Sequence, residues 1–265
     1  MYSSDFDQGI NQFSRHGRIY QLEFAVKSSN HGATSIGIQT AQGVVLAAEK
    51  KVASKLMIVK RSDKVSQIDE HLGATFSGLM ADAKTIIEKL RDDALEHKFE
   101  FNEPLTVRAA TKSIVDVALS FGKHKDSDEE SEEEDEYAMS RPIGVAVLLG
   151  GWDKNGASLY CVDPAGITTK YDAKVIGSAH ESGQAILEAD YYSSISLEDG
   201  IKLALTILRR EMEQRASGNN IELAMITEEG FIRMSSEEID NIIKELEDED
   251  VSEEAELRRR LQEQK

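Results

Sequence analysis

Apolar and polar positions divide this chain into alternating groups of predicted strands and helices. In the first group Thr34, Ile36 and Ile38 alternate with other residues, and Gly43 separates them from the apolar run 44–48. That pattern predicts a β-hairpin. The helical groups instead repeat apolar residues every three or four positions. The predicted strands are 34–38, 44–48, 65–68, 72–76, 145–149, 158–162, 167–171, 221–227 and 231–234. The predicted helices are 81–97, 106–121, 182–192, 197–215 and 235–246.

The order of these elements is strands, two helices, strands, two helices and strands. The run 145–149 is continuously apolar, which indicates a strand buried on both faces. Residues 163–166 read Asp-Pro-Ala-Gly and suit a type I turn. Pattern alone therefore predicts an α+β or α/β fold. We expect a single domain over 1–246 and a charged tail over 247–265.

Charge sets two segments apart from this domain. The chain carries 31 basic and 49 acidic residues, a formal net charge of −18, and nine of the eleven residues in 126–136 are acidic. Such a run repels itself and buries no apolar surface, so we expect a disordered insertion there. In the tail, residues 258–260 are arginines that follow glutamates at helical spacing. They predict a frayed, salt-bridged helix. Both segments are most simply solvated additions to the domain.

Composition excludes several classes of function. An acidic chain lacks the overall basic footprint of a nucleic-acid-binding protein, and no apolar run approaches the length of a membrane span. The single cysteine, Cys161, permits no internal disulfide and favours a reducing compartment. The six histidines lack metal-ligand spacing, and the glycines lack phosphate-loop spacing. We expect no metal, no cofactor, no nucleic acid and no membrane as partners, and a location in the cytoplasm and nucleus.

The segment 7–25 carries the most specific residue string. Ser14 is predicted to cap a helix, on which Ile19, Leu22 and Val26 form one apolar stripe. A helix that precedes the first strand and has both of its faces available for contacts suits packing between neighbouring subunits. By itself the apolar pattern indicates an ordinary surface helix, whereas the residue string is far more specific.

That string resembles the opening signature of the α-type subunits of the 20S proteasome. It consists of Asp7, Phe13-Ser14, Gly17-Arg18, Gln21-x-Glu23 and Phe24-Ala25. Further strings match the same family in order and spacing, at 32–38, 43–51, 77–83, 141–145, 163–166, 176–178 and 220–224. The resemblance implies a four-layer αββα sandwich of the N-terminal-nucleophile hydrolase superfold. It also implies a structural subunit of a seven-membered α-ring that takes part in ubiquitin-dependent protein degradation. Other α-type subunits, β-type subunits and a regulatory particle or other activators would be its partners.

The catalytic relatives in this family use an exposed N-terminal Thr whose free amine activates its own hydroxyl. The resemblance places Ala33 at that position, Glu49 at the position of the acid and Val65 at that of the lysine. A methyl group cannot attack a carbonyl, and the preceding segment leaves no free amine. Strand alternation turns Lys64 to the face opposite Val65. Thr34 and Ser35 neighbour the lost position, but residues of this kind in a strand are usually structural. The resemblance therefore implies a non-catalytic subunit, with no catalytic residue.

A gate is the next implied feature. In the family a Tyr-Asp pair, a Pro and a second Tyr from each subunit hold the entry pore open. The matching positions here are Phe6, Asp7, Arg15 and Phe24. Both tyrosines are replaced by Phe and the Pro by Arg15, so the hydroxyl hydrogen bonds cannot form. Each such bond contributes about 0.5–1.5 kcal/mol net. The alternative is that both Phe residues serve only apolar packing.

An activator-binding pocket is implied at Lys64. A Lys at this position in α-type rings lines a groove between subunits and pairs with the C-terminal carboxylate of an activator. Gly17 and Gly78 match small positions near that pocket. Without the resemblance, a lone Lys at the start of a strand is expected to be solvated.

Two other functions stay open from the sequence. One is an active N-terminal-nucleophile threonine peptidase, which would need cleavage to expose a Thr, Ser or Cys. The other is an acidic binding protein or chaperone for basic partners, suggested by the net charge and by 126–136.

Overall fold

The structure is a computed structural model that describes residues 12–51, 56, 64–122 and 139–263, with only the helical backbone over 250–263. The predicted gate residues Phe6 and Asp7 lie outside these ranges, as does the predicted insertion at 126–136.

Two five-stranded sheets form the centre of the described structure, and every strand pair is antiparallel. The first sheet contains, in spatial order, β10 (Gly230–Arg233), β9 (Ile221–Thr227), β2 (Gly43–Glu49), β1 (Ser35–Thr40) and β8 (Ala173–Ile176). The second contains β3 (Val65–Asp69), β4 (Leu72–Gly78), β5 (Val145–Asp153), β6 (Gly156–Val162) and β7 (Thr168–Tyr171). β1 and β2 form the predicted hairpin, with Thr40 opposite Gly43.

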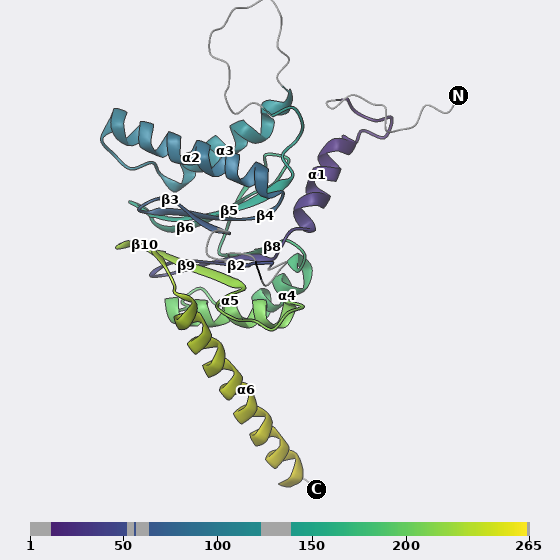
Figure 1. The fold of residues 1–265 in the computed structure, drawn as a ribbon, viewed down its shortest axis with the longest axis vertical. Coiled ribbons are helices and arrows are strands. Elements are labelled where there is room, and N and C mark those ends of the chain that lie inside the picture. The colour runs from purple at the N-terminus through teal and green to yellow at the C-terminus, as the bar shows by residue number, and fades with distance from the viewer. Residues whose placement is uncertain (1–11, 52–55, 57–63, 123–138, 264–265) are drawn as a thin grey trace, which may run out of the picture.

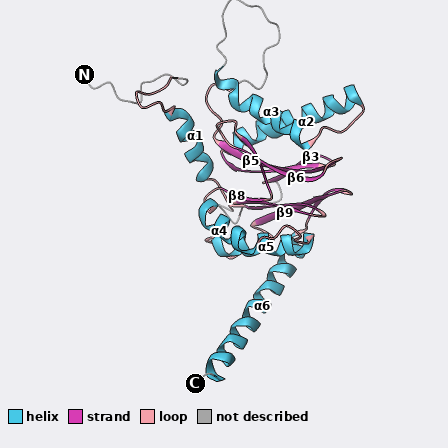
Figure 2. Cartoon of the chain, turned by 180° about the vertical axis from the view of Figure 1, so that it is seen from behind, coloured by secondary structure: helices cyan, strands magenta, loops and turns pink. Residues whose placement is uncertain are grey.

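Helices cover the outer face of each sheet. The helices α2 (Met80–Phe101) and α3 (Val107–Leu119) cover one sheet, and α4 (His180–Asp190) and α5 (Leu197–Glu211) cover the other, whereas α1 (Tyr20–Asn30) and α6 (Ser236–Glu263) lie outside these layers. Figure 1 shows α2 and α3 on one side of the paired sheets and α4 and α5 on the other. The view from behind in Figure 2 shows the same order of helix, sheet, sheet and helix. The α+β prediction and its four-layer form are therefore confirmed.

Three apolar layers hold this stack together, and strand alternation assigns each side chain to one of them. In β2, Val44, Leu46 and Ala48 lie between the two sheets, whereas Val45 and Ala47 face the layer beneath α4 and α5. In β4, Phe76 faces α2 and α3. All seven residues from Val145 to Gly151 are buried, as predicted for a strand covered on both faces.

Local sequence explains where the helices begin and end. The Thr106 hydroxyl accepts a hydrogen bond from Ala109 N at 3.2 Å and starts α3, and Ser196 starts α5 through Asp199 N at 3.1 Å. α2 ends at Asn102, which has a φ of 53°, before Pro104. The predicted turn after β6 also forms, since Gly166 N donates to Asp163 O at 3.0 Å.

Several predicted boundaries were wrong. β8 was not predicted. α2 runs four residues further than expected, to Phe101, because the helix stops only at Asn102, whose left-handed φ of 53° ends it before Pro104. α6 does not end at Leu246 but continues to Glu263. It extends away from the sandwich (Figure 1). With a rise of 1.5 Å per residue its length is about 42 Å.

The N-terminal helix also starts later than predicted. Ser14 does not cap it. Its hydroxyl accepts from Arg18 N at 3.1 Å and closes a turn in which Gly17 has a φ of 72°. α1 then begins at Tyr20 and contacts β4 and β5. It stands at the side of the paired sheets (Figure 1).

Candidate functional site

The start of β1 is where a catalytic member of the resembling family would place its nucleophile. Ala33 occupies this point and is 5 % exposed. The backbone on either side is fixed, because Ser178 N donates to Gly32 O at 3.0 Å and Glu49 N donates to Thr34 O at 2.8 Å. The position therefore holds a buried methyl group within a continuous, hydrogen-bonded chain.

The neighbouring hydroxyls are already engaged. Thr34 Oγ1 lies 3.3 Å from Ser178 Oγ, and Ser35 Oγ donates to Phe76 O at 3.0 Å. The carboxylate of Glu49 accepts from Thr34 N at 3.4 Å. These contacts join β1 to β4 and to the segment after β8. They give both hydroxyls structural roles.

Val65 and Lys64 lie on opposite faces of the second sheet, as alternation predicted. Val65 is fully buried between the two sheets. Lys64 turns to the other side, where its Nζ lies 4.9 Å from the centre of the Phe76 ring. Val65 cannot take the place of a catalytic lysine, and the ammonium of Lys64 lies on the wrong face to do so.

Lys64 is buried, which corrects the expectation of a solvated lysine. Only 7 % of the residue is exposed. Burial lowers the pKa of its ammonium below the ordinary value, and the nearby charge of Lys51 lowers it further. The carboxylates of Glu222 and Glu49 act in the opposite direction but do not outweigh burial.

Glu222 joins the two sheets beside Lys64. Its Oε2 accepts from Lys64 N at 2.6 Å and from Val65 N at 2.9 Å, and its Oε1 forms an ion pair with Lys50 Nζ. Glu222 lies in β9 opposite Ala48, so a residue of the first sheet binds the start of β3 in the second. The sequence signal was a single charge within the apolar run 221–227.

The outer edge of β3 is closed by side chains from other elements. Besides Glu222, Arg233 of β10 donates to Val65 O at 2.6 Å. Arg91 of α2 donates to Gln67 O through two guanidinium nitrogens, at 2.8 and 3.0 Å. Charged side chains at an edge strand prevent pairing with another chain.

A second buried carboxylate joins two of the family-like strings. Asp82, in the first turn of α2, accepts from both terminal nitrogens of Arg141, at 2.7 and 2.9 Å, and from Gly144 N at 2.8 Å. Burial raises the pKa of Asp82, but the hydrogen bonds from Arg141 and Gly144 outweigh burial and hold its pKa below the ordinary value. The strings 77–83 and 141–145 were recognised in the sequence, but the contact between them at Asp82 and Arg141 was not predicted.

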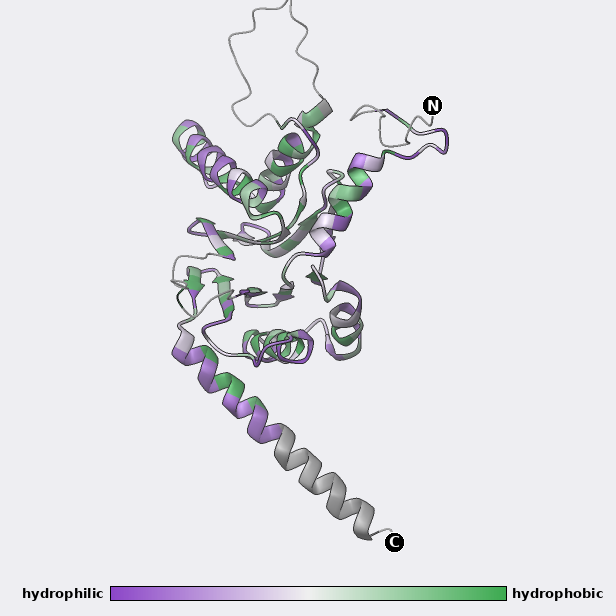
Figure 3. Ribbon diagram, turned by 45° about the vertical axis from the view of Figure 1, so that its right-hand side comes forward, coloured by the Kyte–Doolittle hydropathy of each residue, from purple (hydrophilic) through white to green (hydrophobic). Residues whose placement is uncertain are grey.

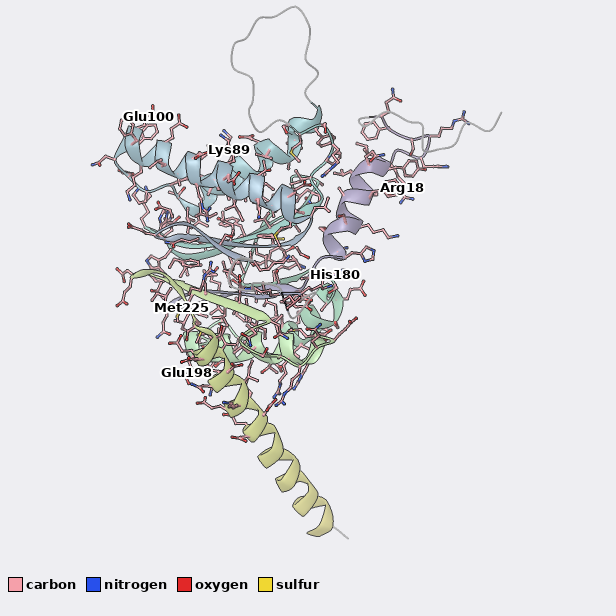
Figure 4. All side chains as sticks on the ribbon, viewed as in Figure 1. Arg18, Lys89, Glu100, His180, Glu198 and Met225 are labelled. Atoms are coloured by element: carbon pink, nitrogen blue, oxygen red, sulfur yellow. The ribbon has the colours of Figure 1, made fainter. Side chains whose placement is uncertain are left out.

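The N-terminal part of the site is exposed. Phe24 is 46 % exposed on α1, and Arg15 is exposed in the turn before it. Arg18 pairs with Glu23, and Figure 4 shows Arg18 at the N-terminal end of α1. In Figure 3 α1 carries hydrophobic residues, coloured green, although it stands at the side of the sheets. Phe6 and Asp7 lie outside the described residues, so the gate cluster stays a prediction.

The two glycines predicted near the pocket differ. Gly17 adopts a φ of 72°, and a Cβ built on it meets open space. Gly78 adopts a φ of 122°, and a Cβ there would lie 2.1 Å from Gly144 O. Close approach to β5 therefore explains Gly78 within this chain, without any bound tail.

Neither a metal-binding cluster nor a membrane-spanning helix occurs in the described part of the chain. No group of three or more His, Cys, Asp or Glu residues there is placed to hold a metal ion. No helix there has the length and apolarity needed to cross a membrane.

Comparison with known proteins identifies the family. The model of the family described as "Proteasome subunit" matches residues 29–226. Proteasome subunit alpha type-5 of Dictyostelium discoideum is 42 % identical over 246 residues, which cover 92 % of this chain and 98 % of that protein. The probable proteasome subunit alpha type-5 of Schizosaccharomyces pombe is 40 % identical over 90 % of this chain and 94 % of its own. Proteasome subunit alpha type-5 of Caenorhabditis elegans is 37 % identical over 92 % of this chain and 98 % of that protein.

These names agree with the detail of the sequence. The strings 139–142 and 221–224 most resemble the fifth eukaryotic α-type subunit. The matched relatives cover nearly the whole chain, including the strings that meet at Asp82 and Arg141. The chain belongs to the family of proteasome subunits.

Proposed function

We propose that this chain is a non-catalytic structural subunit of the outer α-ring of the 20S proteasome. Its relatives are named as α-type subunits, and the match covers nearly their full length. In this role the chain assembles with other proteasome subunits. Seven α-type subunits form its ring, and the ring stacks on β-type subunits. Its place of action is the cytoplasm and nucleus.

One observation carries the non-catalytic part of the proposal. Ala33 stands where the nucleophile belongs, buried and held by backbone hydrogen bonds on both sides. Val65 replaces the lysine, and the Thr34 and Ser35 hydroxyls bind other groups. A threonine-type centre needs a hydroxyl, a free amine and a cation together, and this position supplies none of them.

The test compares the peptidase activity of the purified natural chain with that of the purified Ala33→Thr variant. Neither the natural chain nor Ala33→Thr should hydrolyse a fluorogenic peptide, because the residues before 33 still occupy the amine. The variant should enter the α-ring as the natural chain does, as seen by native sizing and electron microscopy of the particle. Turnover that is blocked by a threonine-directed inhibitor in the natural chain would overturn the proposal.

Gating and activator docking form the finer part of the proposal. Phe6, Asp7, Arg15 and Phe24 contribute to the gate, and Lys64 with Gly17 contributes to the activator pocket. The burial of Lys64 adds a condition, because a carboxylate must reach an ammonium that now lies on the Phe76 ring. A peptide with an activator's C-terminal residues tests this, titrated against assembled particles that carry Lys64 or Lys64→Ala. Loss of a charge-assisted hydrogen bond of about 1.5–3 kcal/mol weakens binding about tenfold or more. Equal occupancy of this pocket would assign Lys64 a role inside the chain alone.

The two other functions have separate tests. A peptidase would show cleavage of the N-terminal segment in the intact mass of the purified chain. An acidic binding protein would migrate as a free chain or a small complex on native sizing, instead of within a particle. No specific observation in the described residues favours either function.

A further inference from the structure

A groove between α3 and the β6–β7 edge is lined by polar and basic residues, which is unusual in so acidic a chain. It has a volume of about 810 Å³. Thr106, Arg108, Lys112, Tyr160 and Thr168 line it. The chain as a whole has a net charge of −18. A local excess of positive charge therefore stands out against the field of the molecule.

Helix and strand periodicity bring the cations together. Arg108 and Lys112 are four residues apart and share one face of α3. In β7, Thr168 and Lys170 lie opposite Val162 and Tyr160 of β6. Because paired residues in a sheet share a face, Lys170 lies on the α3 side of the sheet, as Val162 does.

The three cations have no ion pair within the part of the chain that the structure describes. All three are exposed. The nearby carboxylates of Asp153 and Asp163 are occupied by backbone N–H groups, at Val107 and Asn155 for the first and at Ala165 and Ile167 for the second. Both carboxylates therefore hold loops in place, and neither forms an ion pair with the three cations.

The other end of the groove is apolar. Leu119 is 52 % exposed, and its Cδ2 would lie 3.2 Å from a Cβ built on Gly166, which lines the groove. Val115 lies beside it, 3.7 Å from the same point. The floor of the groove ends at β7, which is the last strand of its sheet. Charge, an apolar shelf and a strand edge are the features that bind extended peptides.

We propose that this groove binds an extended acidic segment of a partner protein. Carboxylates of the segment meet Arg108, Lys112 and Lys170, and an apolar side chain of the segment rests on Leu119. A peptide fits better than a nucleic acid, because the cations stand beside an exposed apolar residue, Leu119, and beside the edge strand β7, which a peptide backbone can pair with. The inference concerns the α3 side of the second sheet and does not depend on the gate.

The test is binding of a fluorescein-labelled octapeptide, Glu-Glu-Leu-Glu-Glu-Leu-Glu-Glu, to the full chain, measured by fluorescence anisotropy. Replacement of Arg108 and Lys112 by Ala should weaken binding by about tenfold or more, since two charge-assisted contacts are lost. The matched control replaces Lys84 and Lys98, two exposed lysines of α2, by Ala and should bind as the natural chain does. Raising the salt concentration should weaken binding to the natural chain.

Three further measurements separate a loss of binding from a loss of folding and locate the bound peptide. Circular dichroism and thermal unfolding show whether the double variant is folded, and Thr168→Glu provides a second variant that repels the probe without altering α3. A photo-crosslinker in place of the first Leu of the peptide should mark α3 or the β6–β7 turn. The proposal would be overturned by an equal loss of binding in the Arg108/Lys112 variant and the Lys84/Lys98 control, by crosslinks elsewhere, or by equal affinity for an eight-nucleotide single-stranded DNA. Binding that appears only after deletion of 126–136 would also overturn it, because the occupant would then be the chain's own acidic segment.

Discussion

Asp82 and Glu222 are both buried carboxylates that join segments far apart in the sequence, but their partner cations lie in different surroundings. The side chain of Arg141, the partner of Asp82, is 48 % exposed, whereas that of Lys50, the partner of Glu222, is 8 % exposed. Water stabilises the charge of Arg141 whether or not it is paired. The ammonium of Lys50 is buried, so water cannot stabilise its charge if the charge of Glu222 is removed. The surroundings of the cation therefore determine how far the free energy of unfolding falls when the carboxylate is mutated.

The largest effect is expected at Glu222. Glu222→Gln removes the charge from a fully buried pair and weakens the acceptor of two N–H groups of β3. The free energy of unfolding should fall by about 3–5 kcal/mol, as measured by urea unfolding of the isolated chain. A double variant, Glu222→Gln with Lys50→Met, should recover part of this loss, because the amide oxygen still accepts from the two N–H groups of β3 and the buried ammonium is removed. A loss below about 1 kcal/mol, the range of surface pairs, would contradict the comparison.

Asp82→Asn should have a smaller effect. It weakens the hydrogen bonds from Arg141 and Gly144 but leaves a well-solvated Arg141, so the loss should be about 1.5–3 kcal/mol. Glu23→Gln is the matched control, since it removes a carboxylate from another arginine pair that lies at the surface. Its effect should stay within about 0.5 kcal/mol. If both variants lose the same amount, the burial of Asp82 has no energetic consequence.

The pKa of Asp82 adds a dependence on pH. Its pKa in the folded chain lies below the ordinary value of 3.8, so its ionised form stabilises the fold. That contribution is complete above the unfolded pKa and is lost as pH falls through the lower, folded pKa. The gap in unfolding free energy between the natural chain and Asp82→Asn should therefore narrow as pH falls from about 5 to about 2. A gap that widens in this range would mean that the pKa of Asp82 is raised.

The smallest effect on stability is expected at Lys64. Its ammonium is buried and its pKa is lowered, so removal of the charge relieves a desolvation penalty. Lys64→Met keeps the length of the side chain over the Phe76 ring. It should leave the unfolding free energy unchanged within about 1 kcal/mol or raise it. A loss as large as that of Glu222→Gln would show that Lys64 belongs to the ion pair of Lys50 and Glu222.

Much of the fold follows from local pattern. The hairpin at β1 and β2 was predicted because alternation and a glycine turn are adjacent in sequence, and β9 was predicted with its observed bounds, 221–227. β8 was missed because it has four residues and follows β7 after one residue. The end of α6 was misplaced because the acidic run after Leu246 was interpreted as a boundary, whereas the charged tail, which was predicted as a separate frayed helix, continues α6 without a break.

The site was less predictable than the fold. The loss of the nucleophile at Ala33 follows from comparison of residue strings, and alternation assigned the face of Lys64. Its burial could not be predicted, because the residues that surround it come from β4 and β9. Glu222 is 158 positions away in sequence from Lys64. No local pattern reports a contact over that separation.

The closed edge of β3 has a consequence for biosynthesis. The last strand of the second sheet, β7, ends at Tyr171, yet two of the side chains that close the edge, Glu222 and Arg233, lie near the C-terminal end. A ribosome therefore releases the strands of this sheet well before it releases the residues that protect their outermost strand. During that interval the nascent chain presents an open β-edge to other nascent chains, the situation in which newly made proteins aggregate. This edge is completed only after residues 222 and 233 have emerged, and a chaperone that shields β3 would act in the period before then.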